Sequence, residues 1–537
     1  MKESLKPRHE SSELLRNISQ DVLRISGRPK DYYEIAATLE SMGYNDDRIF
    51  SDFGYRDIFQ ISERIFQLIL REGLEIDKGK SYFKNSKYTV SQGILDIIRS
   101  FLSVCPLLIS MFSVFIINFS LWSFMDKTLT SIEQATLIAF AAIASSIFAG
   151  GFTQAFLRRG YVLREHSNYK AIWKMHIKSL ITGLFGVLII EAALTILDFF
   201  TGIYRLENML IFDLYFFLLT AMWLIMPIAN IIKVELPFAI NLIASTGLVY
   251  FLKEIQGMNI IYSQAIAMCS FVIINLIVYK VIFIILAAIK KSRDTKSEHK
   301  PRLLISIYSL APYFIYGIMY YVFIFMDRLV AWTANGRTIL EPVIRMKGTY
   351  DLGMNWGILA ILIPSLFIET FFKLLINGDL RAQKEYFVTE GKQYINKIVS
   401  RFSTFTVVFF SINVIGAAFS TWIINNIVFF YNIDLSPYFN NTTRMVFYLG
   451  IIGYVFITMG LLNNIYLLYF SQGSLILKPL LISIGVNFIT GFILSRMFDY
   501  YFAVFGFLAG AVSFYILSWF SVQKILKSMD YYSYKNT

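Results

Sequence analysis

The residues of this chain that could carry out chemistry are ionisable side chains set in long apolar runs. Asp327 and Arg328 stand side by side at the end of APYFIYGIMYYVFIFMDRLVAW. Glu191 interrupts LFGVLIIEAALTIL, and Glu369 and Lys373 lie four residues apart in a later run. Charged groups in such surroundings are costly unless they bind a ligand, a proton or one another. Each is therefore a candidate binding site.

Asp327 and Arg328 lie 23–24 residues beyond a predicted helix start near residue 304. That is about 35 Å along a helix axis, near the edge of a hydrocarbon layer about 30 Å thick. Adjacent helical residues point about 100° apart, so one side chain can face a cavity while the other contacts a neighbouring helix or a headgroup. A role at the rim of a cavity and a role as a membrane anchor are both open.

The other ionisable groups allow both binding and structural roles. Glu191 lies near the middle of its run, where a lone carboxyl can bind a proton, a cation or a basic substrate group. A hydrogen bond to a neighbouring helix is the alternative. Glu369 and Lys373 share a helix face, which predicts an ion pair between them. Lys233 and Glu235, in ANIIKVELPF, predict a tight turn between two helices.

A stripe of tyrosines precedes Asp327 in the same run. Tyr313, Tyr316 and Tyr320 recur at three- and four-residue spacing, which places them on one face of a helix. Aromatic rings can stack on sugar rings, and phenol hydroxyls can exchange hydrogen bonds with sugar hydroxyls. The stripe therefore suits a saccharide ligand, and ordinary packing between helices is the alternative.

The sequence contains no pattern typical of a metal site, a cofactor site or a catalytic nucleophile. Four histidines are scattered through polar segments, and the two cysteines, Cys105 and Cys269, lie in separate apolar runs. We find no ATP-binding element either. We therefore expect no catalytic residues, no bound metal and no cofactor, and we do not expect an enzyme.

The candidate residues must be positioned by membrane helices, because the composition is that of a polytopic membrane protein. The 537 residues are 56% hydrophobic and 16% charged, against about 25% charged in a typical soluble domain. The net charge of +12 does not indicate nucleic-acid binding. Residues 1–95 hold 15 basic and 15 acidic residues, so the whole excess lies between and after the apolar runs.

Twelve runs are long enough to span a bilayer as helices, so we predict an all-α fold with about 12 transmembrane helices. They form two groups of six, predicted as bundles over residues 96–289 and 304–525 and separated by a basic linker at 290–303. The runs cover roughly 100–124, 134–157, 178–199, 209–231, 236–253, 262–289, 304–332, 353–377, 402–425, 444–469, 477–496 and 501–523.

Basic residues are concentrated on one side of these runs. The segments on that side hold 20 Lys and Arg, against about eight on the other side. Because Lys and Arg favour cytoplasmic loops, we predict a multi-pass protein of the cell (inner) membrane with both termini in the cytoplasm. The basic segments are 158–178, 290–302, 379–401 and 524–537.

Residues 1–95 predict a small, separate helical region on the cytoplasmic side. SGRPKDYYEIAATLESMGY contains a helix start and a stop at Gly43, and RDIFQISERIFQLILREGL has helical apolar spacing with a stop near Gly73. We predict that residues 526–537 form a cytoplasmic tail.

Several segments resemble a family of polysaccharide flippases. MDRLVAW at 326–332, followed by KGTYDLGMNWGIL at 347–359, is similar to members of the multidrug/oligosaccharidyl-lipid/polysaccharide (MOP) superfamily. Within it, YFIYGIMYYVFIFMDRLVAWT most resembles the Pel-type exopolysaccharide transporters. The segment GGFTQAFLRRG at 150–160 is similar as well.

This resemblance implies two helical bundles around a hydrophilic cavity and export or flipping of an exopolysaccharide, or its precursor, by alternating access. The implied partners are the lipid bilayer, a polysaccharide and a membrane-bound polysaccharide synthase complex. Two alternatives stay open, namely a cation-coupled multidrug exporter of the same superfamily and a membrane glycosyltransferase or polymerase. The residues expected to line or gate the cavity are Asp327, Arg328, Tyr313, Tyr316, Tyr320, Glu191 and Glu369.

Overall fold

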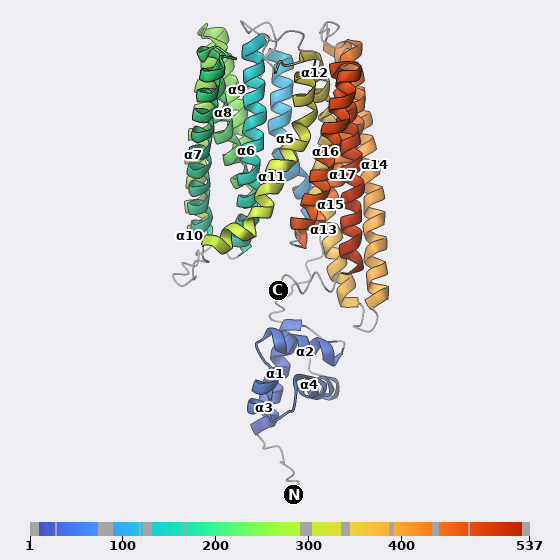
Figure 1. Ribbon diagram of the computed structural model, residues 1–537. Helices are drawn as coiled ribbons and strands as arrows, with labels where there is room; N and C mark the ends of the chain where they lie inside the picture. Colours follow the sequence, from blue (N-terminus) through green and yellow to red (C-terminus); the bar gives the residue numbers. More distant parts are fainter. Residues whose placement is uncertain are drawn as a thin grey trace. The chain divides into compact units, whose positions relative to one another are not determined.

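In a computed structural model, every regular element of the described residues is a helix (Figure 1). The chain divides into two units, one of Met1–Gln92 with Leu374–Arg401 and one of Gly93–Lys373 with Phe402–Thr537. All but the last residue of the predicted linker at 290–303, and most of the tail at 526–537, lie outside the described residues. The described residues are 10–26, 29, 31–72, 90–117, 120–121, 132–165, 167–289, 303–334, 344–385, 391–431, 440–470 and 473–528.

The first unit contains four short N-terminal helices that share one apolar core. Asp31 caps α2 by accepting a hydrogen bond from the Glu34 amide at 2.9 Å, as expected for an acidic N-cap. The two helices predicted in this region are confirmed, and the second of them ends one residue before Gly73. The helices are α1 (Glu10–Ser26), α2 (Tyr32–Ser41), α3 (Asp46–Phe53) and α4 (Ile58–Glu72).

The first six predicted runs coincide with helices that we call the first half. Its α9 continues as a short π-helical turn, η2 (Phe251–Ile255), before the next helix begins. The helices of the first half are α5 (Val90–Ile117), α6 (Ile132–Glu165), α7 (Tyr169–Thr201), α8 (Leu206–Ile232), α9 (Leu236–Tyr250) and α10 (Ile260–Ile289).

The last six runs coincide with the second half, in which α12 and α13 together make one span. Eleven described segments are long and apolar enough to cross a membrane, and α5 falls on the remaining run. The helices of the second half are α11 (Leu303–Trp332), α12 (Gly348–Gly357), α13 (Leu359–Glu385), α14 (Gly391–Tyr431), α15 (Asn441–Tyr469), α16 (Gly473–Met497), η4 (Tyr500–Phe502) and α17 (Ala503–Lys527).

Helix α11 packs against α6 of the first half and against α16 and α17 of its own half, and it runs obliquely between the two groups (Figure 1). It meets α6 at a pair of glycines, where a Cβ on Gly150 would lie 2.7 Å from the Gly317 carbonyl oxygen. Further along, the Phe323 ring lies 5.5 Å from that of Phe514 in α17. The close backbone contact at Gly150 and Gly317 requires that neither residue carries a side chain.

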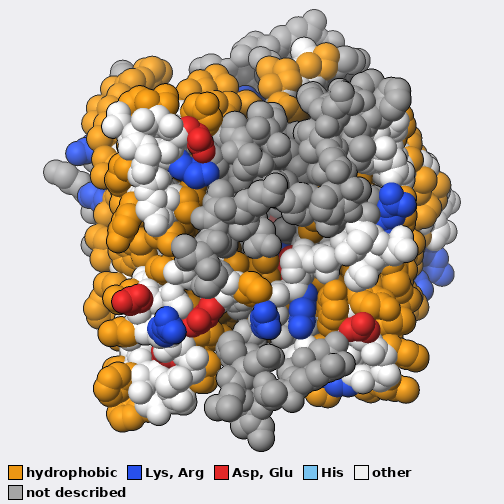
Figure 2. Space-filling view, turned by 90° about the horizontal axis from the view of Figure 1, so that it is seen from above, with side chains coloured by type: hydrophobic (Ala, Val, Ile, Leu, Met, Phe, Trp, Pro, Cys, Tyr) orange, Lys and Arg blue, Asp and Glu red, His pale blue; other side chains and the backbone are white. Residues whose placement is uncertain are grey.

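The outward faces of the long helices are apolar. On α7 and α10, for example, Phe185 is 64% exposed and Ile277 is 58% exposed. Apolar side chains also cover much of the rim of the face in Figure 2, with charged side chains singly or in small groups between them. Such continuous apolar surfaces are suited to lipid contact.

Candidate functional site

The C-terminal end of α11 and the start of α12 bring the predicted Asp-Arg pair together with a second acid. The Tyr350 hydroxyl donates to Asp327 Oδ2 at 2.6 Å, and Trp332 Nε1 donates to Asp351 Oδ2 at 2.8 Å. Arg328 interacts electrostatically with both carboxyl groups. All five side chains are buried. The two quoted motifs, MDRLVAW and KGTYDLGMNWGIL, therefore form one polar network.

The local sequence explains why these helix ends meet. Tyr350 and Asp351 lie in the first turn of α12, where an acidic residue is favoured by the helix dipole. The preceding segment returns to α11, because the Arg345 amide donates to the Trp332 carbonyl at 3.2 Å. Asp351 lies in the KGTYDLGMNWGIL motif, but it was not among the predicted site residues.

Two residues of α16 fix the end of α11 at its backbone. Asn487 Nδ2 donates to the Phe323 carbonyl at 3.2 Å, and Arg496 Nη1 donates to the Val330 carbonyl at 3.1 Å. A cation at the last carbonyls of a helix is favourable for the same dipole. These contacts hold the Asp-Arg pair against α16, and nothing in the linear sequence indicated them.

Several atoms of this network are buried without a hydrogen-bond partner. They are Asp327 Oδ1, Asp351 Oδ1 and both Nε and Nη2 of Arg328. Tyr454 of α15 lies beside the guanidinium. Buried donors and acceptors are normally paired, so unpaired ones mark a place where a proton, water or a polar ligand completes the hydrogen bonds. With all groups ionised, two carboxylates flank one guanidinium and the net charge is −1.

Two of the three predicted tyrosines contact helices on either side of α11, and the third packs on its neighbour in the stripe. The Arg158 guanidinium of α6 lies 5.2 Å from the Tyr313 ring centroid. Asn464 Nδ2 of α15 donates to the Tyr316 hydroxyl at 3.3 Å, and the Tyr320 ring lies 6.0 Å from that of Tyr316. The stripe is thus placed where the two halves adjoin.

Glu191 belongs to a different site, in the first half. It is 7% exposed and interacts with Asp213 of α8, whose Oδ2 accepts a hydrogen bond from Thr195 at 2.9 Å. Glu191 Oε1 and Asp213 Oδ1 are buried without a partner. Asp213 was not predicted, although a lone acid in the apolar run IFDLYFF is the same signal that indicated Glu191.

Glu369 lies far from the α11–α12 network, 18 residues or about 27 Å along the helix from Asp351. Its Oε1 is 2.7 Å from Lys373 Nζ, which confirms the predicted ion pair. It is also 3.7 Å from Lys233 Nζ, and Lys373 Nζ is 2.7 Å from Asp96 Oδ1. The predicted pair is therefore part of a larger cluster that reaches α5 and the α8–α9 turn.

The α8–α9 turn has the tight geometry predicted for Lys233 and Glu235. Helix α8 ends at Ile232, and Lys233 adopts φ 58°, in the left-handed region. Burial, and next the Lys373 ammonium, lower the pKa of Lys233. Burial raises the pKa of Glu235. Both charges thus lie in a partly dehydrated environment.

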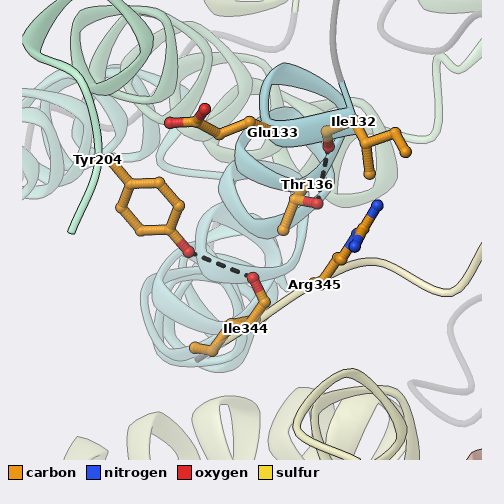
Figure 3. A pocket seen from close by; sticks show the side chains of 6 residues that line it. All are labelled: Ile132, Glu133, Thr136, Tyr204, Ile344 and Arg345. Carbon is orange, nitrogen blue, oxygen red and sulfur yellow. Dashed lines mark hydrogen bonds between the residues drawn. The ribbon is translucent and has the colours of Figure 1, made fainter. Parts of the chain in front are cut away.

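A cavity of about 160 Å³ lies where the start of α6, the α7–α8 connection and the segment before α12 meet (Figure 3). The Tyr204 hydroxyl points to the Ile344 carbonyl and donates to it at 3.3 Å, and the Met346 amide donates to Thr136 Oγ1 at 3.1 Å. None of the lining residues was predicted as a site residue from the sequence. They are Ile132, Glu133, Thr136, Tyr204, Ile344 and Arg345.

Among the described residues, no group of three or more His, Cys, Asp or Glu side chains is arranged to hold a metal ion.

Residues 96–534 match the family profile of PelG, an exopolysaccharide exporter family (EPS-E). Among solved structures, the chain is similar to an outward-facing multidrug resistance MATE transporter of the MOP superfamily, with 12% identity over 82% of this chain and 96% of that one and a TM-score of 0.52. It is also similar to the Vibrio cholerae MATE transporter VcmN, with 12% identity over 82% and 98% and a TM-score of 0.56. At these identities the structures establish a shared fold. A search of curated proteins finds no match.

Proposed function

The chain belongs to the PelG family of exopolysaccharide exporters and is a multi-pass membrane transporter, and we propose that it moves an exopolysaccharide or its precursor by alternating access. The observation that carries this proposal is the family match, which spans all twelve predicted membrane runs. The MATE-like fold supports it, because two groups of helices around one interface suit a machine that opens alternately to either side.

In this proposal the α11–α12 network and the tyrosine stripe contact the passing polymer. The unpaired edge of Arg328 can donate hydrogen bonds to sugar hydroxyls, and the free oxygens of Asp327 and Asp351 can accept them. Tyr313, Tyr316 and Tyr320 lie on the same helix. A row of weak contacts suits transport, since a polymer must bind at each step and also leave.

We further propose an orientation with both termini in the cytoplasm and the protein in the cell (inner) membrane. The concentration of basic residues in 158–178, 290–302, 379–401 and 524–537 supports this side as cytoplasmic. In this orientation residues 1–95 form a cytoplasmic domain, and we propose that they contact a membrane-bound polysaccharide synthase that supplies the polymer.

The test is to measure surface and secreted polysaccharide in a strain that lacks the gene, with drug sensitivity measured in parallel. We expect the polymer to be lost, restored by the wild-type gene, and not restored by Asp327→Asn at equal membrane abundance. Lys280→Gln, an exposed lysine on α10, serves as the control and should restore export. Unchanged polymer in the deletion strain would contradict the proposal.

The carboxyl pair on α7 and α8 favours a second candidate, cation-coupled drug export. Two adjacent membrane-embedded carboxyl groups can exchange a proton or cation during a transport cycle. This candidate predicts that loss of the gene increases drug sensitivity and that Glu191→Gln fails to restore resistance. Normal resistance in the deletion strain, together with loss of polymer, would exclude it.

A further inference from the structure

We infer that six charged side chains form a latch that fastens the two halves together at one end and opens during each transport cycle. The latch lies at the end of the helices where α5 begins, α8 ends and α17 ends. The inference rests on the proposed transport function. The latch residues are Asp96, Arg99, Lys233, Glu235, Glu369 and Lys373.

The ion pairs of the latch cross between the halves. Lys373 of α13 lies 2.7 Å from Asp96 of α5, and Glu369 of α13 lies 3.7 Å from Lys233 of the α8–α9 turn. Within α13, Lys373 and Glu369 are 2.7 Å apart, so each partner is held in place by the other. A displacement of α13 from the first half would separate both cross-pairs together.

The charges of the latch are balanced, with three acidic and three basic groups. Arg99 lies 3.6 Å from Asp96. Glu235 lies two residues after Lys233, and the charges of Arg99 and Lys233 favour its carboxylate whereas that of Glu369 opposes it. A balanced cluster holds the halves without leaving an uncompensated charge at their interface.

The backbone conformation of Lys233 is a second, independent observation in favour of a functional role for its side chain. Lys233 occupies the left-handed position that follows a helix, where glycine is usual and a long side chain is strained. In this conformation the Lys233 ammonium lies close enough to Glu369 of the other half to form an ion pair. Glycine at this position would relieve the strain and remove the ion pair.

The latch is strong enough to favour a closed state and weak enough to open. The three side chains of the cross-pairs on α13 and at the α8–α9 turn are partly exposed, at 28% for Lys373, 37% for Glu369 and 26% for Lys233. Water can therefore replace their partners. Ion pairs with this exposure shift an equilibrium by up to roughly fivefold each. Two cross-pairs acting together then set a closed-to-open ratio that substrate or partner contacts can reverse.

The first experiment measures the distance between the halves without any substrate. Spin labels are placed at Lys174→Cys on α7 and Lys524→Cys on α17, both exposed and at the latch end, after the native cysteines are replaced by serine. We expect Lys373→Gln and Lys233→Gly to add or enlarge a longer-distance population. Lys373→Arg should restore the wild-type distribution, and Lys280→Gln should leave it unchanged. Identical distributions in all variants would overturn the inference.

The second experiment locks the latch. In a cysteine-free background, Asp96→Cys and Lys373→Cys are joined by a reducible bifunctional thiol reagent, and polymer export is measured before linking, after linking and after reduction. We expect linking to stop export and reduction to restore it. A pair within α3, outside the latch, Arg48→Cys and Asp52→Cys, whose native side chains lie 3.5 Å apart, should keep exporting when linked. Continued export by the linked cross-half pair would overturn the latch, whereas absence of export from the wild type would contradict the proposed function instead.

Discussion

The α11–α12 network contains two carboxyl groups and one guanidinium, so loss of the arginine and loss of an acid should have unequal effects on stability. Arg328→Met leaves two buried carboxyl groups, Asp327 and Asp351, without their shared cation, and removal of one partner of a buried ion pair costs about 3–5 kcal/mol. Asp351→Asn leaves one acid and one base, and its amide oxygen can still accept the hydrogen bond from Trp332. Asp351→Asn should therefore lower the free energy of unfolding by only about 1 kcal/mol, as expected for a single weakened hydrogen bond.

The test combines the free energy of unfolding in detergent with polymer export at equal membrane abundance. The triple variant Asp327→Asn/Arg328→Met/Asp351→Asn removes every charge of the network and should recover part of the stability that Arg328→Met alone loses. It should still fail to export, because the proposed contacts with the polymer are gone. Equal stability of Arg328→Met and Asp351→Asn, or a triple variant no more stable than Arg328→Met, would show that the charges of the network do not control its stability.

Three further predictions follow from other contacts. Gly317→Ala drives a methyl group into the Gly150 carbonyl and should cost about 1–3 kcal/mol of stability, whereas Gly485→Ala meets open space and should be neutral; equal melting temperatures would contradict this. Burial raises the pKa of Glu235 in the folded protein above the value of about 4.3 that a glutamate has in an unfolded chain. The folded state therefore loses stability as the pH rises above about 4.3 and this carboxyl group ionises. Glu235→Gln should therefore exceed wild type in melting temperature at pH 8, with a difference that shrinks toward pH 4; a pH-independent difference would count against it. Tyr316→Phe removes the acceptor for an amide of α15 and should cost no more than about 1.5 kcal/mol in the same assay, and a larger loss would indicate a wider rearrangement.

The helices could be predicted because a bilayer leaves few alternatives. An apolar run of about 20 residues must satisfy its backbone hydrogen bonds internally, which in a single segment means a helix. Interruptions such as the turn at Lys233 were also predictable, since a charged pair between two apolar runs cannot remain in the hydrocarbon layer. The predicted ion pair of Glu369 and Lys373 needed only the helical repeat.

The partners of these residues could not be predicted, because they depend on which helices meet. Asp96 and Lys373 are separated by 277 positions, and no periodicity indicates that α5 and α13 meet at this point. Asp351 lies in a conspicuous motif of the sequence. Its role in the network, however, depends on its contacts with Trp332 and Arg328 of α11, which only the folded chain shows. Charged residues near helix ends are common, and only the assembled helices distinguish a latch from separate membrane anchors.

The contacts of α11 determine which half carries the proposed polymer site when the latch opens. Toward α16, α11 is held by hydrogen bonds from Asn487 and Arg496 to its own carbonyls. Toward α6 it makes a glycine contact and aromatic packing, such as that of Phe152 on Phe314 at 5.2 Å. Packing surfaces can slide by small steps, whereas the buried hydrogen bond from Asn487 to the Phe323 carbonyl is costly to break. Helix α11 should therefore move with the second half, so that the Asp327 network stays intact while the α6–α11 interface changes.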